Sequence, residues 1–344
     1  MDSTPKLRLS GPGSLIAAVP LLLGFPPEQS LVVVGLRGAP SRLGITMRLD
    51  LPPDGLQDAP SVEELHPLAQ ALRGDDASDC LAMIVTDRPD DDGVPPYVDL
   101  VSNLEEALEE CGIGVSDIVL VRAGRWRSYL CPDSTCCPPG GSPVPPPSDE
   151  LAAHAAYSGS VVRASRADLA ALIARDASAA ASTERALGHV GQELADASVA
   201  GRSEAHLAGI EALIDRRVCA LAGGTPRPLS HRDAARMSVG LIDRQVRDRV
   251  AAYCLQENAS AAESLWIDLL RRVPAPLDAA PATMLAMSSW ARGDGAMANV
   301  ALDRALASDP AYSLAQLVRT ALDHALPPAT VAQMLAGPCA EAAG

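Results

Sequence analysis

Three cysteines gather in the segment YLCPDSTCCPPGG and are the residues best suited to metal chemistry. The thiolates of Cys131, Cys136 and Cys137 could hold a zinc ion, with Cys80 or Cys111 as a fourth ligand. Zinc knuckles use paired Cys-x-x-Cys units, and the spacing in this segment differs from theirs. The spacing therefore favours the other interpretation, a turn with reduced, partly buried thiols that could form a Cys131–Cys136 disulfide on oxidation.

A second candidate set lies where the predicted strands end. Asp50, Asp87 and Arg122 each follow the carboxyl end of a strand, the edge at which open α/β sheets bind ligands. Carboxylates there could hold a divalent cation, and arginines could clamp an anionic substrate. The charge pattern favours the alternative, a solvated loop at Asp90–Asp92 beside an exposed hairpin. The candidate ligand-binding residues are Arg48, Asp50, Asp87, Arg122, Arg125 and Trp126, although core packing is the simpler interpretation of Trp126.

The sequence lacks the motifs of the common nucleotide-binding and hydrolytic enzymes. A Walker A loop is excluded because Lys6 is the only lysine, and no G-x-G-x-x-G follows a predicted strand. There is no G-x-S-x-G elbow and no H-E-x-x-H helix, and the six histidines form no spaced pair. The sequence therefore assigns no catalytic residue and no cofactor.

The elements that would position these residues form an α/β domain in the first part of the chain. The pattern predicts the order β-β-α-β-α-β-β, in which two right-handed crossovers make three of the strands parallel. We therefore expect a three-layer domain, with a mixed sheet that has a parallel core and hairpin strands at its ends. The predicted elements are a short helix after Ser14, strands at Leu31–Leu36, Leu43–Leu51, Leu81–Thr86, Asp117–Val121 and Arg125–Leu130, and helices at Val62–Arg73 and Tyr97–Cys111.

The sequence pattern predicts helices almost throughout the second part of the chain. We predict an α/β domain at residues 1–137, a Pro/Gly-rich linker at 138–148 and an all-α domain at 149–344. Small and bulky residues at about 278–325 have the spacing of a tetratricopeptide-like unit, although an ordinary Ala-rich helical hairpin explains them equally well. Three long helices are expected at Ala167–Leu187, Glu193–Leu221 and Met237–Tyr253.

The overall composition restricts the classes of partner. With 28 Lys and Arg residues against 43 Asp and Glu residues, the net charge is −15, which disfavours binding to nucleic acids and anionic membranes. The longest apolar run, near Ser14–Phe25, is too short to span a bilayer and contains Pro20. We find no pattern of a signal peptide and expect a cytoplasmic protein with mostly reduced cysteines.

Four segments of the chain form a recognisable series: LLGFPPEQSLVVVGL, GITMRLDLP, GRWRSYLCPDSTCCPPGG and SWARGDGAMANVALDRALASDPAYSLAQLV. In this order they resemble an uncharacterised actinobacterial family, domain of unknown function 4192, and the resemblance covers nearly the whole chain. The resemblance implies no activity, cofactor or catalytic residue. The motif positions it supports are Gly24, Phe25, Ser30, Arg48, Asp50, Pro52, Arg125, Trp126, Cys131, Cys137, Pro138 and Gly140.

These observations predict a protein that binds a small molecule or a protein partner without a recognisable catalytic constellation. The alternative is a metal-dependent enzyme that uses Asp50 and Asp87 on a phosphorylated or nucleotide-like small molecule at the strand ends. A third possibility is that the cysteine segment serves as a redox or zinc-stabilised loop.

Overall fold

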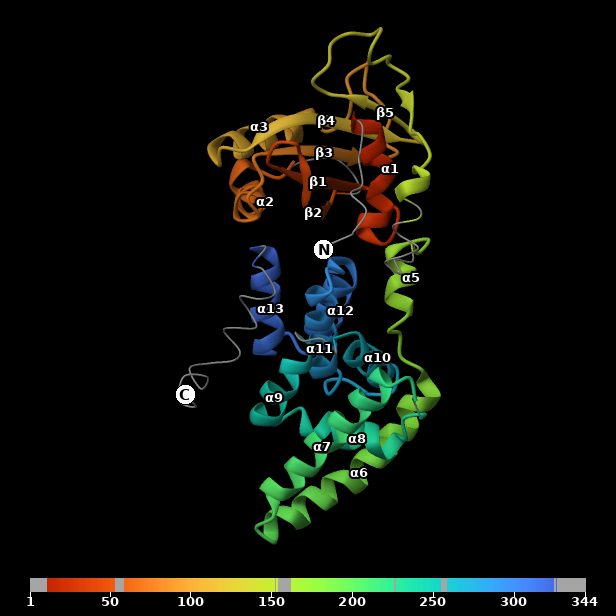
Figure 1. Ribbon diagram of the computed structural model, residues 1–344, viewed down its shortest axis with the longest axis vertical. Coiled ribbons are helices and arrows are strands. Elements are labelled where there is room, and N and C mark those ends of the chain that lie inside the picture. Colours follow the sequence, from red (N-terminus) through yellow and green to blue (C-terminus); the bar gives the residue numbers. More distant parts are fainter. Residues whose placement is uncertain are drawn as a thin grey trace. The chain divides into compact units, whose positions relative to one another are not determined.

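A computed structural model describes residues 11–52, 59–151, 153, 162–225, 227–254, 259–324 and 326 (Figure 1). Contacts between Cα atoms divide these residues into two compact units. One comprises the described residues up to Ser165 together with Asp323 and His324, and the other comprises those from Arg166 to Leu322 together with Leu326. The first is an α/β unit and the second is helical, as the sequence predicts.

The α/β unit contains one mixed six-stranded sheet in the order β2-β1-β3-β4-β5-β6. The strands are β1 (Ser30–Arg37), β2 (Arg42–Asp50), β3 (Asp79–Val85), β4 (Gly114–Arg122), β5 (Arg125–Ser128) and β6 (Ser142–Pro143). Strands β3 and β4 pair in parallel, and the other neighbours pair antiparallel. Because β1 is antiparallel to both β2 and β3, strands β2, β3 and β4 run in one direction, as predicted. Strand β1 separates β2 from β3, so only one hydrogen-bonded pair is parallel.

Helices cover both faces of this sheet and give the predicted three layers. Helix α1 (Gly11–Leu23) packs on one face, whereas α2 (Val62–Gly74) and α3 (Val98–Glu110) lie side by side on the other (Figure 1). Strand β3 shows the alternation behind this arrangement: Leu81 and Met83 contact the α1 face, while Ile84 joins the core under α2 and α3.

In this unit, the predicted first residue is correct for one helix and wrong for another, and local hydrogen bonding explains both outcomes. At α2, Ser61 accepts from the Glu64 N–H and the Glu64 carboxylate accepts from the Ser61 N–H, a capping box that fixes the predicted start. The predicted start of the first helix at Ser14 is wrong. Helix α1 begins at Gly11, because a proline such as Pro12 is tolerated in a first helical turn, where its missing N–H has no intrahelical partner.

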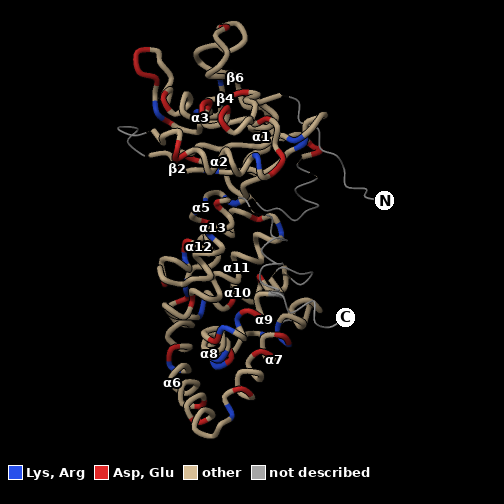
Figure 2. Tube along the Cα trace, turned by 90° about the vertical axis from the view of Figure 1, so that its left-hand side faces the viewer, with Lys and Arg blue, Asp and Glu red and all other residues tan. Residues whose placement is uncertain are grey.

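The helical unit is built from nine described helices. They are α5 (Arg166–Ala171), α6 (Ala177–Val199), α7 (Ser203–Ala222), α8 (His231–Gly240), α9 (Arg244–Cys254), α10 (Ala259–Leu270), α11 (Ala279–Ala291), α12 (Gly295–Ser308) and α13 (Ser313–Asp323). Basic and acidic residues are interspersed along them (Figure 2), and several pair, as Glu193 does with Arg236 at 3.0 Å. None of the described helices is long and apolar enough to cross a membrane.

The three predicted long helices are wrong in extent. Each predicted range runs across a break between two helices, as Met237–Tyr253 does between α8 and α9. The break has a local cause, because the Asp243 carboxylate accepts hydrogen bonds from the N–H groups of Gln245 and Val246 at 2.9 and 3.1 Å. An aspartate that caps a new helix in this way competes with continuation of the previous one.

The predicted repeat-like segment folds as a helical hairpin. Helices α11 and α12 pack closely, with Ala286, Ala298 and Leu302 fully buried between their neighbours. Gly293 makes the turn in a left-handed conformation, with φ at 83°. The structure thus supplies two tightly packed helices at the predicted place, and the likeness to a tetratricopeptide unit stays a prediction.

A buried carboxylate fastens this hairpin to its surroundings. The Asp278 side chain is 2% exposed and accepts from Arg304 Nη2 at 3.0 Å and from the Ser308 hydroxyl. Arg304 also donates to the Leu270 carbonyl at 2.7 Å and to the Ile173 carbonyl. The Asp278–Arg304 ion pair and its hydrogen bonds therefore connect the start of α11, the body of α12, the end of α10 and the segment before α6.

Candidate functional site

A polar cluster centred on Gln29 lies at the edge of the sheet where β2 and β3 end. The Gln29 amide oxygen accepts from the Thr86 hydroxyl at 2.8 Å, and its nitrogen donates to the Tyr97 hydroxyl at 2.5 Å. The same nitrogen lies 3.2 Å from the Pro52 carbonyl oxygen. Since Pro52 follows β2, Thr86 follows β3 and Tyr97 precedes α3, one side chain holds three element ends together.

The backbone is strained at this edge. Gln29, Asp92 and Tyr97 adopt positive φ angles of 41°, 49° and 63°, a region that residues other than glycine rarely enter. Each such residue costs on the order of 1–3 kcal/mol and persists only where its surroundings fix it. The hydrogen bonds of the Gln29 cluster supply that fixation for Gln29 and Tyr97. Strain of this kind clusters at ligand sites, which makes the edge a functional candidate.

A hollow of about 610 Å³ opens beside Tyr97. The Arg88 guanidinium carbon lies 5.7 Å from the centre of the Tyr97 ring, in cation–π contact. Within the described part of the chain, no carboxylate forms an ion pair with Arg88. The residues around the hollow include Arg88, Asp91, Asp92, Val94, Tyr97 and Asp99, together with prolines of the adjoining loops.

Asp90 joins two arginines beside this hollow. Its carboxylate lies 3.1 Å from Arg122 Nη1 and 2.7 Å from Arg127 Nη2, and its side chain is 23% exposed. Arg122 also donates to the Arg88 carbonyl at 2.6 Å and thereby fixes the backbone that carries Arg88. The interpretation of Asp90 as part of a solvated loop is wrong, because partners on β4 and β5 lie within reach of this side chain.

Replacement of Asp90 by alanine is expected to lower the free energy of unfolding of the α/β unit by about 1–3 kcal/mol, since two partly buried guanidinium groups lose their partner. Urea unfolding monitored by hydrogen exchange of the β4 and β5 amides measures the effect. Asp87→Ala, at an exposed position three residues earlier, is the matched control. Equal losses in the two variants would contradict a structural role for the Asp90 pairs.

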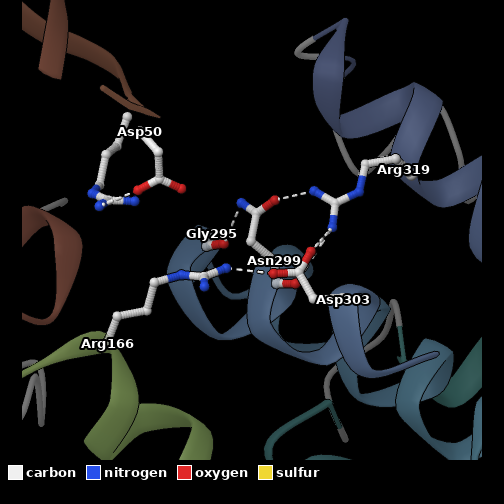
Figure 3. Close-up of polar contacts among 7 residues, drawn as sticks. Asp50, Arg166, Gly295, Asn299, Asp303 and Arg319 are labelled. Atoms are coloured by element: carbon white, nitrogen blue, oxygen red, sulfur yellow. Dashed lines mark hydrogen bonds and ion pairs between the residues drawn. The ribbon is translucent and has the colours of Figure 1, made fainter. Parts of the chain in front are cut away.

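The two predicted strand-end carboxylates, Asp50 and Asp87, lie in different surroundings. Asp50 pairs with Arg48 at 2.6 Å and is 75% exposed (Figure 3), and Asp87 is exposed in the next loop. Arg48 in turn lies over the Phe25 ring, with 5.8 Å from its guanidinium carbon to the ring centre. Among the residues the structure describes, neither Asp50 nor Asp87 belongs to a group of three potential metal ligands.

The other predicted residues, Arg125 and Trp126, lie on β5 and support the Pro/Gly-rich segment. Arg125 donates to the carbonyls of Gly140 at 2.7 Å and Gly141 at 2.6 Å, so its guanidinium is occupied by backbone. Arg127 likewise donates to the Pro139 carbonyl at 3.1 Å. The Trp126 ring packs against the core beneath α1, in line with the core interpretation of that residue.

The three cysteines do converge. The Sγ atoms of Cys131, Cys136 and Cys137 all lie within 4.8 Å of one another, and the three thiols are free. The structure does not bring the expected fourth ligands, Cys80 and Cys111, into this group. Cys80 is buried in β3, where desolvation raises its pKa to about 12, so its thiol stays protonated at neutral pH.

Comparison with known proteins places this architecture in a family. The sequence profile of the domain of unknown function DUF4192 matches residues 12–329, which span both units. The chain belongs to this family. No curated protein matches it, and no solved structure does.

Five of the DUF4192 motif positions inferred from the resemblance form two contact sets. Phe25, Arg48 and Asp50 form one, through the ring contact and the ion pair of Arg48. Arg125 and Gly140 belong to the other, through the hydrogen bond that anchors the Pro/Gly-rich segment behind the cysteines. These five positions therefore belong to two supporting structures of the α/β unit.

Sequence reasoning missed the residues at the centre of the edge site. Gln29, Thr86 and Tyr97 are ordinary side chains in sequence, and nothing in their spacing indicates that three element ends meet there. Arg88 could have been predicted, because it follows the same predicted strand as Asp87. Open α/β sheets bind ligands at the carboxyl ends of their strands, and both residues lie at such an end.

Proposed function

We propose that the α/β unit of this DUF4192 protein binds a small molecule in the hollow beside Tyr97, with Arg88 as the group that recognises an anionic part of the ligand. The observation that carries the proposal is the Arg88 guanidinium, which lines the hollow, stacks on Tyr97 and has no carboxylate partner among the described residues. The strained edge and the Gln29 cluster support it, because they hold Tyr97 in place under Arg88.

The chemistry of the lining indicates the kind of ligand. A guanidinium presents donors in a planar fork that matches a carboxylate or a phosphate, and its stacking on an aromatic ring orders that fork. Asp91, Asp92 and Asp99 line the same hollow and favour a ligand that also carries an amine or other hydrogen-bond donors. We therefore infer a small ligand that combines an anionic group with a cationic or donor group.

The test is a binding screen on the full chain with small molecules that carry amino, carboxylate and phosphate groups. A ligand found in this way is expected to bind Arg88→Ala about 10–100-fold more weakly, the equivalent of one charge-assisted interaction of roughly 1.5–3 kcal/mol. Arg42→Ala, which removes an exposed arginine at the start of β2, should bind like the unmodified protein. Equal affinity of Arg88→Ala and Arg42→Ala would contradict the proposal.

A metal-dependent enzyme at the same edge is supported less well. Among the described residues, neither Asp50 nor Asp87 belongs to a group of three or more potential metal ligands. The ion pair between Asp50 and Arg48 already neutralises one of the two carboxylates. Binding therefore accounts for the arrangement better than catalysis does.

A further inference from the structure

We propose that Cys131, Cys136 and Cys137 bind one Zn²⁺ ion through three thiolates and leave a fourth coordination position for water or an exogenous ligand. This inference is independent of the proposed function, because none of the three cysteines lines the hollow beside Tyr97.

The distances between the sulfur atoms suit one ion. Zinc–thiolate bonds of about 2.3 Å in a tetrahedron place the sulfur atoms about 3.8 Å apart. The three Sγ atoms lie within 4.8 Å of one another without any ion present, so closure around zinc requires movements of about 1 Å or less. The described residues contain no fourth Cys, His, Asp or Glu in this group. Three ligands with an open position is the arrangement of zinc sites that exchange their fourth ligand.

Hydrogen bonds hold the cysteine loop in this shape. The Cys137 N–H donates to the Asp133 carbonyl at 2.7 Å, and the Thr135 N–H donates to the Asp133 carboxylate at 2.8 Å. At the start of the loop, the Cys131 N–H donates to the Ser128 hydroxyl at 3.0 Å. The thiols are therefore brought together by the fold of the loop itself, which reduces the conformational entropy that a metal would have to overcome on binding.

Deprotonation of the three thiols would place like charges within 4.8 Å of one another. Three thiolates this close repel one another, and a divalent cation removes that repulsion. Zinc binding should accordingly weaken as the pH falls, because protons then compete for the three sulfur atoms.

The test measures zinc in the full chain, purified under reducing conditions and dialysed against Zn²⁺ without a chelator. We expect about one zinc ion per chain in the unmodified protein. Cys136→Ser, at the most exposed of the three positions, and Cys137→Ser should each retain less than about a tenth of that zinc. Cys219→Ser replaces an exposed cysteine on α7, outside the cluster, and should bind zinc like the unmodified protein.

The absorption spectrum of the protein with Co²⁺ is a second measurement, which distinguishes a variant that has lost the metal site from one that has lost its fold. The unmodified protein should show thiolate-to-cobalt charge-transfer absorption that zinc abolishes, while the Cys136→Ser variant, checked by circular dichroism, should fold without it. The proposal is overturned if the folded variant keeps its zinc, or if the reduced protein takes up neither metal. It is also overturned if a Cys131–Cys136 disulfide forms in air despite stoichiometric zinc, since the thiols would then serve redox chemistry.

Discussion

Asp278→Ala is expected to lower the free energy of unfolding of the helical unit by about 3–5 kcal/mol, the largest effect of any substitution discussed for this protein. The substitution leaves the Arg304 guanidinium inside the unit without its carboxylate, and the Ser308 hydroxyl loses its acceptor. A charge that is buried and uncompensated costs more than the ion pair itself contributes. Urea unfolding, followed by hydrogen exchange of the α11 and α12 amides, reports the loss within the unit concerned.

Asp303→Ala is the matched control, because it removes a carboxylate from the same helix pair at the surface. Asp303 accepts from Arg319 at 2.5 Å and from Arg166 (Figure 3), and its side chain is 50% exposed. Ion pairs in such positions contribute about 0–1 kcal/mol, so the expected loss stays below about 1 kcal/mol. A similar loss in the two variants would show that burial does not set the contribution of Asp278.

Gly141→Ala is expected to destabilise the α/β unit by about 2–4 kcal/mol. Gly141 has φ at 69°, and an added Cβ would lie 2.9 Å from the Trp126 carbonyl oxygen. The neighbouring atoms belong to the backbone of β5, which cannot move without breaking its pairing with β4. An alanine at this position would be held in an unfavourable left-handed conformation, and its Cβ would collide with the β5 backbone. Hydrogen exchange of the β5 amides should therefore accelerate.

Gly140→Ala controls for this prediction at the next position. A Cβ at Gly140 meets no atom within 4 Å, and its φ is not in the left-handed region. We expect a change in unfolding free energy within about 0.5 kcal/mol. If Gly140→Ala were as destabilising as Gly141→Ala, the loop would be sensitive to any added methyl group and the close approach to Trp126 would not be the cause.

The α/β unit was largely predictable from sequence, because its signals are local. Apolar runs in Leu31–Leu36 and Leu81–Thr86 correspond to strands covered on both faces, and the capping box at Ser61 fixes the start of α2. The position of β1 between β2 and β3 was not predictable from these patterns, since pairing between strands distant in sequence depends on tertiary packing.

The helical unit was predictable as a class but not in its segmentation. The helical spacing of apolar residues in its Ala-rich sequence continues past the points where the helices end. At Asp243, for example, the side chain caps a new helix, and this capping competes with continuation of the previous helix. The candidate sites divide in the same way. The three cysteines are close in sequence and proved close in space, whereas the Gln29, Thr86 and Tyr97 cluster depends on three chain segments that meet only in the fold.

A crystal structure of the full chain, soaked with a ligand from the binding screen, tests the central proposal most directly. The proposed function predicts density in the hollow beside Tyr97, with an anionic group of the ligand within hydrogen-bond distance of the Arg88 guanidinium. A ligand bound elsewhere on the chain, with Arg88 free of contact to it, would contradict the proposal.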